Sequence, residues 1–131
     1  MKKALDFLVA AKVFYLATDD GGQPRVRPLG LVMEFDGKIC FSTNNQKPMF
    51  AQMQANPKVE ICAAAPDGRW LRLCGNARFV TSRAAKQKAL DTMPMLARMY
   101  SADDTVFEIF TVENATATFQ SMAGDKETVT W

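Results

Sequence analysis

Residues 12–43 read KVFYLATDDGGQPRVRPLGLVMEFDGKICFST and predict three consecutive antiparallel strands. The first strand carries aromatic and β-branched side chains on both faces, which is typical of a strand that is covered on both sides. The aspartate and glycine residues of DDGG and DG form the turns between the strands. The three strands of this meander are predicted over residues 12–18, 24–35 and 38–43.

The rest of the chain adds helices and further strands. Pro48, Ser82 and Pro94 are typical of helix starts, and Gly75 indicates a bulge within the longest predicted strand. We therefore expect an α+β protein with a mostly antiparallel six-stranded sheet that closes into a small barrel with short flanking helices. The remaining helices and strands are predicted over residues 2–11, 47–55, 82–91 and 94–100, and over residues 59–65, 70–81, 106–112 and 115–122.

The chain has 131 residues, which is room for a single domain over residues 1–131. Hydrophobic residues make up 48% and charged residues 23%, as in a globular protein with a real core. The longest uncharged apolar runs have about ten residues, roughly half of what crosses a bilayer, and no secretory signal follows Met1. We expect a cytoplasmic protein with no membrane partner. Because more strand faces are apolar than one small barrel can bury, we also expect a homodimer.

The chain contains no histidine. This excludes serine or cysteine nucleophiles activated by histidine, histidine-bound zinc and the usual general base near neutral pH. Cys40, Cys62 and Cys74 are an odd number at wide spacing, so we expect buried thiols and no disulfide framework or metal site. The net charge of +2 provides no basic excess for nucleic-acid phosphates. Catalysis would rest on carboxylates, amines, phenols or a bound cofactor, and the sequence names no catalytic residue.

The motif GQPRVRPLG, residues 22–30, combines two arginines with an interrupted strand. Period-two alternation places Arg25 and Arg27 on one face of the strand. Pro28 removes a ladder hydrogen bond and Gly30 bares the backbone, so main-chain groups there are available to a ligand. The pattern fits either an anion site or two solvated arginines at a strand end with proline guarding the edge.

The segment FSTNNQKP, residues 41–48, carries a second set of groups that suit an anion. Ser42, Thr43 and Asn44 supply hydroxyls and an amide, and Lys47 supplies an ammonium beside a helix start. Because the second and third strands are hairpin neighbours, this segment and the two arginines can meet at one phosphate. Ser42 to Asn44 also fit ordinary capping of the helix.

Four strings in this order resemble the pyridoxamine 5′-phosphate oxidase-like family of FMN-binding split β-barrels. They are RVRP at residues 25–28, FSTN at 41–44 with a lysine close behind, MQANPKVEI at 53–61 and WLRLCGNARFV at 70–80. The similarity spans about residues 5–121 and lies in the order and spacing of the strings. It implies a split barrel that forms a homodimer with two FMN molecules at the subunit interface.

The resemblance also implies cofactor contacts, carried over position by position. It makes Arg25, Arg27 and Lys47 phosphate ligands, and Trp70 and Arg72 would reach the flavin of the other subunit. Trp70 equally fits a dimer-interface aromatic, and Arg72 a solvated strand residue. The complete set of implied cofactor residues is Arg25, Arg27, Pro28, Leu29, Ser42, Thr43, Asn44, Lys47, Trp70 and Arg72.

The chain departs from the family's best-known enzyme at its C-terminal end. Only DKETVTW follows Gly124, so the basic and aromatic segment that holds pyridoxine phosphate has no counterpart. The chain is more similar to the short branch of general-stress and nitroimidazole-reductase-like proteins, although the latter often carry a histidine near the flavin. We expect an FMN-dependent oxidoreductase for a small molecule, with NAD(P)H as the candidate reductant. The alternatives are a non-catalytic protein that binds FMN or another planar cofactor, such as haem or a deazaflavin, and a dimeric barrel without a cofactor.

Overall fold

The computed structural model describes all residues from 1 to 131 and confirms the α+β class. In chain order the elements are α1 (Lys2–Ala11), β1 (Phe14–Asp20), β2 (Gln23–Leu29), β3 (Val32–Phe35), β4 (Lys38–Asn44), α2 (Pro48–Ala55), β5 (Lys58–Ala64), β6 (Trp70–Phe79), α3 (Arg83–Thr92), the 3₁₀ helix η1 (Pro94–Arg98), β7 (Phe107–Gln120) and β8 (Lys126–Thr130).

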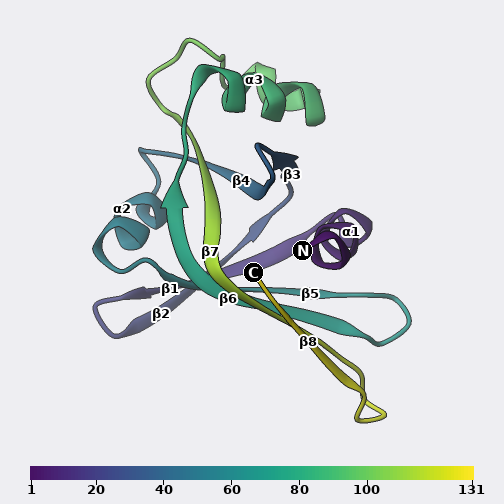
Figure 1. Cartoon of the computed structure of the whole chain (residues 1–131). Coiled ribbons are helices and arrows are strands. Elements are labelled where there is room, and N and C mark those ends of the chain that lie inside the picture. Colours follow the sequence, from purple (N-terminus) through teal and green to yellow (C-terminus); the bar gives the residue numbers. More distant parts are fainter.

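All strand pairs are antiparallel and belong to one sheet of eight strands, so the expected number of six was wrong. The order is β2-β1-β5-β6-β7-β4-β3, and β8 adds to β7 (Figure 1). The sheet is not closed, because β2 and β3 are its two edges and do not pair with each other. The predicted strand over residues 24–35 breaks at Gly30 and Leu31, so β2 pairs with β1 whereas β3 pairs with β4. The C-terminal tail supplies the further strand β8.

A bulge bends the two longest strands at Gly75, as predicted. The register on β7 skips between the partners of Cys74 and Asn76, so β7 has an extra residue opposite Gly75. Residues 106–112 and 115–122, expected as two strands, form the single strand β7 that continues through the bulge. Figure 1 shows β6 and β7 curving together along the whole length of the molecule.

Two apolar clusters hold the helices on the sheet. The larger contains 20 buried residues from the strands, α1 and α2. At its centre the ring of Phe41 lies 5.7 Å from that of Phe14 and 5.4 Å from that of Phe110. The smaller cluster contains seven residues and holds α3 against β3, β4 and β7 through Ala85 and Ala89. Burial of these side chains is the main driving force for the fold.

Cys40 is buried in the smaller cluster, and desolvation raises the pKa of its thiol to about 11. The expectation of three buried thiols was wrong for Cys62 and Cys74, which are exposed. They lie on β5 and β6 at positions that alternate with core residues such as Ile61 and Leu73. The outer face of these strands has no covering layer within one chain.

Ser82 caps α3, as predicted from the sequence, because its Oγ accepts a hydrogen bond from the amide of Ala85 at 3.0 Å. We expect S82A to lower the free energy of unfolding by about 1 kcal/mol, the usual cost of a lost N-cap. Urea denaturation measures the change. S82D keeps an acceptor at the cap and is expected to retain most of the stability; equal stability of S82A and the unchanged protein would contradict a capping role.

Candidate functional site

A cavity of about 150 Å³ lies where the ends of β2 and β4 meet the start of α2. The end of β4 lies there because Phe41 pairs with Val32, the first residue of β3, just after the chain leaves β2. Half of the ten predicted cofactor residues line this cavity: Pro28, Leu29, Ser42, Thr43 and Lys47. The break between β2 and β3 thus creates the space that these side chains share.

Thr43 is the residue of this cavity whose chemistry most clearly calls for a ligand. The residue is only 4% exposed, and its Oγ1 has no hydrogen-bond partner within the protein. Leaving a buried hydroxyl unpaired costs about 1–3 kcal/mol. A polar ligand group that reached this hydroxyl would remove that cost.

Lys47 precedes α2 and has an extended backbone, with Pro48 opening the helix. The ammonium of Lys47 makes no hydrogen bond or ion pair within the chain. No side chain caps α2, so Ser42, Thr43 and Asn44 do not have the capping role that the sequence left open. The cation and the helix start keep their capacity to bind an anion.

Arg27 does not line the cavity, but it is next in sequence to Pro28, which does. Its Nη1 donates to Thr18 Oγ1 at 2.8 Å, and its Nη2 donates to Gln52 Oε1, in the second turn of α2, at 2.6 Å. Burial and the neighbouring charge of Arg25 lower the pKa of Arg27. Because the Nε–H makes no hydrogen bond within the chain, the fixed guanidinium keeps a donor for a ligand.

Arg25 lies on the same face of β2 as Arg27 but is paired differently. Its Nε is 3.2 Å from Asp20 Oδ2 in an exposed ion pair at the β1–β2 turn. Arg25 does not line the cavity. Of the three cations expected at the phosphate, only Lys47 thus lines the cavity. Arg27 is bound to α2 through Gln52, and Arg25 is bound to Asp20 at the β1–β2 turn.

Asn44 is engaged with the protein itself. Its Nδ2 donates to the hydroxyl of Tyr100 at 2.6 Å, and its Oδ1 accepts from the amide of Gln46 at 2.9 Å. The ring of Tyr100 stacks on Phe107 with centroids 4.4 Å apart. Asn44 therefore orients Tyr100, which is part of the cavity wall.

Trp70 and Arg72 lie on β6, away from the cavity. Trp70 pairs with Ala64 at the end of the β5–β6 hairpin. Arg72 Nη2 is 2.9 Å from Glu60 Oε2, and this hydrogen bond and the charge of Glu60 raise the pKa of Arg72. Their assignment to the flavin of a second subunit stays a prediction.

The opposite wall of the cavity comes from residues that the sequence did not assign to a site. For the segment MPMLARMY, residues 93–100, the sequence predicted a short helix and left open whether the segment shapes the substrate side or packs on the barrel, with packing favoured. In the structure η1 forms most of this segment. Its packing under α3 turns methionine and leucine side chains toward the predicted cofactor residues. The lining residues of this wall are Met93, Leu96, Met99, Tyr100 and Phe107.

The model of the family described as pyridoxamine 5′-phosphate oxidase matches residues 1–121 of this chain. The chain belongs to the pyridoxamine 5′-phosphate oxidase family. A NimC/NimA family protein from Clostridium acetobutylicum is 43% identical in sequence and superposes with a TM-score of 0.92. That comparison covers 98% of this chain and 93% of the other.

Two more distant members of this fold carry names that mention a cofactor. A FAD-binding protein from Mesorhizobium loti is 18% identical, with a TM-score of 0.62, over 92% of this chain and 94% of that chain. A heme binding protein from Mycobacterium smegmatis is 18% identical, with a TM-score of 0.77, over 98% of this chain and 56% of that chain. At these identities the similarity shows the fold alone. No protein of curated function matches the sequence, and no helix has the length and apolar composition to span a membrane.

Asp104 ties the wall segment of this pyridoxamine 5′-phosphate oxidase family member to β7. Its carboxylate accepts hydrogen bonds from the amides of Ser101 at 2.9 Å, Val106 at 3.1 Å and Phe107 at 2.9 Å. Burial of the carboxyl opposes ionisation, but the amides and the Lys86 charge outweigh it and lower the pKa of Asp104. The carboxylate thus fixes the two ends of the loop between η1 and β7.

We expect D104A to lower the free energy of unfolding at neutral pH by about 2 kcal/mol, through the loss of charge-assisted hydrogen bonds. Because the folded pKa lies below that of the unfolded chain, this stability is present above about pH 4 and is lost as pH falls through the folded value. Urea denaturation of both proteins between neutral and acidic pH measures the difference, which is expected to shrink at low pH. A difference that stays constant with pH would contradict a role for the ionised carboxylate.

Proposed function

We propose that this protein binds FMN in the cavity between β2, β4 and α2 and acts as a flavin-dependent oxidoreductase on a small molecule. The observation that carries the proposal is the hydroxyl of Thr43, a residue that lines the cavity, because this hydroxyl is buried and has no hydrogen-bond partner within the chain. The same cavity has an unpaired ammonium, a second hydroxyl and the apolar surface of Pro28 and Leu29. Hydroxyls and a cation suit a phosphate, whereas the apolar surface suits a flat ring.

The chain's residues have separate tasks in this proposal. Lys47 and Arg27 bind the phosphate, and Gln52 and Thr18 keep the Arg27 guanidinium in place. Ser42 and Thr43 bind the phosphate and ribityl chain, while Pro28 and Leu29 line the ring. FMN supplies hydride acceptance and delivery when bound, so the absence of histidine does not limit the chemistry.

The two related proteins whose names mention a cofactor differ in that cofactor, FAD in one and heme in the other. The choice of cofactor for this chain therefore rests on the chemistry of its residues. Haem iron is most often held by a histidine, and this chain has none. A phosphate also needs cations, which Lys47 and Arg27 supply. Both observations favour FMN over haem, and a deazaflavin that carries a phosphate meets the same requirements.

A second subunit completes the site in this proposal. A cavity of about 150 Å³ is smaller than ordinary ligand pockets of about 300–1,000 Å³, so it encloses only part of FMN. On the outer face of β1 and β2, Tyr15 is 50% exposed and Val26 is 68% exposed, so two large apolar side chains share one uncovered face. We propose that two chains pack through this face and that Trp70 and Arg72 of each approach the flavin held by the other.

The dimer proposal predicts that V26E weakens self-association at least about tenfold, because the charge must be buried at the interface. Analytical ultracentrifugation of the unchanged protein is expected to show a dimer. V9E changes an exposed valine on α1 instead and is expected to leave the dimer intact. A monomeric unchanged protein, or a V26E dimer of equal strength, would contradict this interface.

The cofactor proposal is tested by the absorption spectrum of the purified protein, followed by release and identification of the pigment. We expect FMN, or saturable uptake of added FMN by colourless protein. Anaerobic mixing with NADH or NADPH then separates the two functions. Bleaching of the flavin by a nicotinamide supports the oxidoreductase, whereas reduction by dithionite alone supports a non-catalytic flavin carrier. Protein with no flavin and no FMN uptake overturns both.

A further inference from the structure

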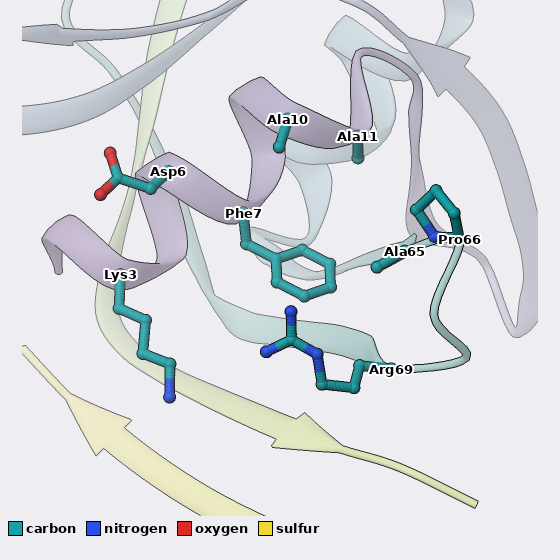
Figure 2. A pocket seen from close by; sticks show the side chains of 8 residues that line it. All are labelled: Lys3, Asp6, Phe7, Ala10, Ala11, Ala65, Pro66 and Arg69. Atoms are coloured by element: carbon teal, nitrogen blue, oxygen red, sulfur yellow. The ribbon is translucent and has the colours of Figure 1, made fainter.

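A second cavity, of about 280 Å³, lies between α1 and the turn that joins β5 to β6. It shares no lining residue with the proposed FMN site. Figure 2 shows Ala10 and Ala11 of α1 on one side, Ala65 and Pro66 of the turn on the other, and the ring of Phe7 between them. Three alanines leave the space open that longer side chains would fill. The walls of this cavity are therefore mainly apolar.

Arg69 lines this cavity and has two amino groups that make no hydrogen bond within the chain. Arg69 binds Asp67 through its Nε at 2.9 Å and its backbone amide at 3.0 Å. Its two terminal amino groups, Nη1 and Nη2, make no hydrogen bond or ion pair within the chain. The guanidinium carbon lies 5.9 Å from the centre of the Phe7 ring. Figure 2 shows the guanidinium beside this ring. The two free amino groups of Arg69 are thus held beside the apolar ring of Phe7.

The remaining charged side chains at this cavity are already neutralised. Lys3 is paired with Glu127 and lies over the ring of Phe119. Asp6 is paired with Lys2 at 3.3 Å, and Figure 2 shows its carboxylate directed away from Phe7. Asp67 is paired with the Arg69 guanidinium through Nε alone, and neither Asp6 nor Glu127 binds the Nη groups of Arg69. An incoming carboxylate would find a bidentate donor, which is the geometry that guanidinium groups bind best.

We propose that this cavity binds a small aryl carboxylate, whose ring lies against Phe7 between α1 and the β5–β6 turn and whose carboxylate binds Nη1 and Nη2 of Arg69. The volume, just below the range of drug-sized pockets, suits a ligand of one or two rings. The Phe7 ring is fixed in place by an edge contact with Phe119, at 5.9 Å between centroids, so it offers a rigid surface for stacking.

The test uses 2-naphthoate as the probe and calorimetric titration of the full-length protein. We expect a dissociation constant of about 1 mM or tighter. R69Q removes the charged fork and is expected to weaken binding about 10- to 100-fold. A10L fills the cavity without changing any charge and is expected to weaken the binding of 2-naphthoate by a similar factor. Amide NMR shifts caused by the ligand are expected to concentrate on α1 and the β5–β6 turn.

R83Q is the matched control, because Arg83 is an exposed arginine that binds Asp103 through its Nε as Arg69 binds Asp67. It is expected to bind 2-naphthoate like the unchanged protein, and thermal unfolding checks that all variants are folded. Three results would overturn the proposal: no saturation by about 10 mM probe, binding by R69Q or A10L as tight as by the unchanged protein, or binding of neutral 2-naphthamide as tight as that of 2-naphthoate. Since A10L leaves the FMN cavity untouched, unchanged FMN uptake by this variant separates the two sites.

Discussion

The double variant R27A/K47A is expected to bind FMN at least about 100-fold more weakly than the unchanged protein. Each cation is expected to make a charge-assisted hydrogen bond to the phosphate, worth about 1.5–3 kcal/mol. Losing both costs about 3–6 kcal/mol, and each 1.4 kcal/mol is about tenfold in affinity. Titration of the apoprotein with FMN, followed by flavin fluorescence, measures the change.

The control for this prediction is R78A/K2A, which also removes one arginine and one lysine. These side chains are paired with Glu113 and Asp6 outside the cavity, so FMN affinity is expected to stay unchanged. Thr18 and Gln52 remain hydrogen-bonded to each other without Arg27, so circular dichroism is expected to show a folded R27A/K47A. Equal FMN affinity of the two double variants would contradict a phosphate site at Lys47 and Arg27.

Replacing Gly75 by alanine is expected to destabilise the fold by about 3 kcal/mol. A Cβ atom at this position would lie 2.5 Å from the carbonyl oxygen of Glu113 and 2.7 Å from Val112 Cγ1. The first contact is with backbone, which cannot move away without opening the bulge between β6 and β7. Thermal unfolding measures the loss, expected as a decrease of about 10 °C in the midpoint.

Gly30 provides the matched control for this substitution. A Cβ at Gly30 would meet only the end of Met93 at 3.5 Å and Lys12 O at 3.8 Å, both ordinary contacts. We expect G30A to keep or slightly raise the stability, since alanine reduces the freedom of the unfolded chain. If G75A were as stable as G30A, the close approach of the strands at the bulge would not limit this position.

Local chemistry predicted the helices and the bulge well. The predicted helix over residues 2–11 is α1, and α3 begins directly after its cap Ser82. The number of strands was wrong because residues 24–35 form one strand or two according to their neighbours, which lie elsewhere in the sequence. β1 holds one half and β4 holds the other. Nothing within the segment except Gly30 signals that division.

Only the part of the candidate site formed by β2, β4 and the start of α2 could be predicted from the sequence. Hydroxyls and cations in the sequence, together with the resemblance to the family, indicated residues of β2 and β4, and half of the implied set lines one cavity. The partners of Arg27 were not predictable, because Gln52 is 25 residues away and becomes a neighbour only when α2 packs on β1. The cavity wall from Met93 to Tyr100 was not predictable for the same reason, because its position depends on how α3 packs on the sheet.

The open edge at β2 bears on how the molecule behaves in concentrated solution. β2 has a single neighbour, so its outer side is free to accept a foreign strand. Residues 24, 26 and 28 point their nitrogens in one direction, and a proline in a paired strand must turn its nitrogen away from the partner. Two of these three residues are Pro24 and Pro28, so only Val26 offers an N–H along that stretch. The outer edge of β2 is therefore a poor template for fibril growth, and the chain can leave this edge unpaired without polymerising through it.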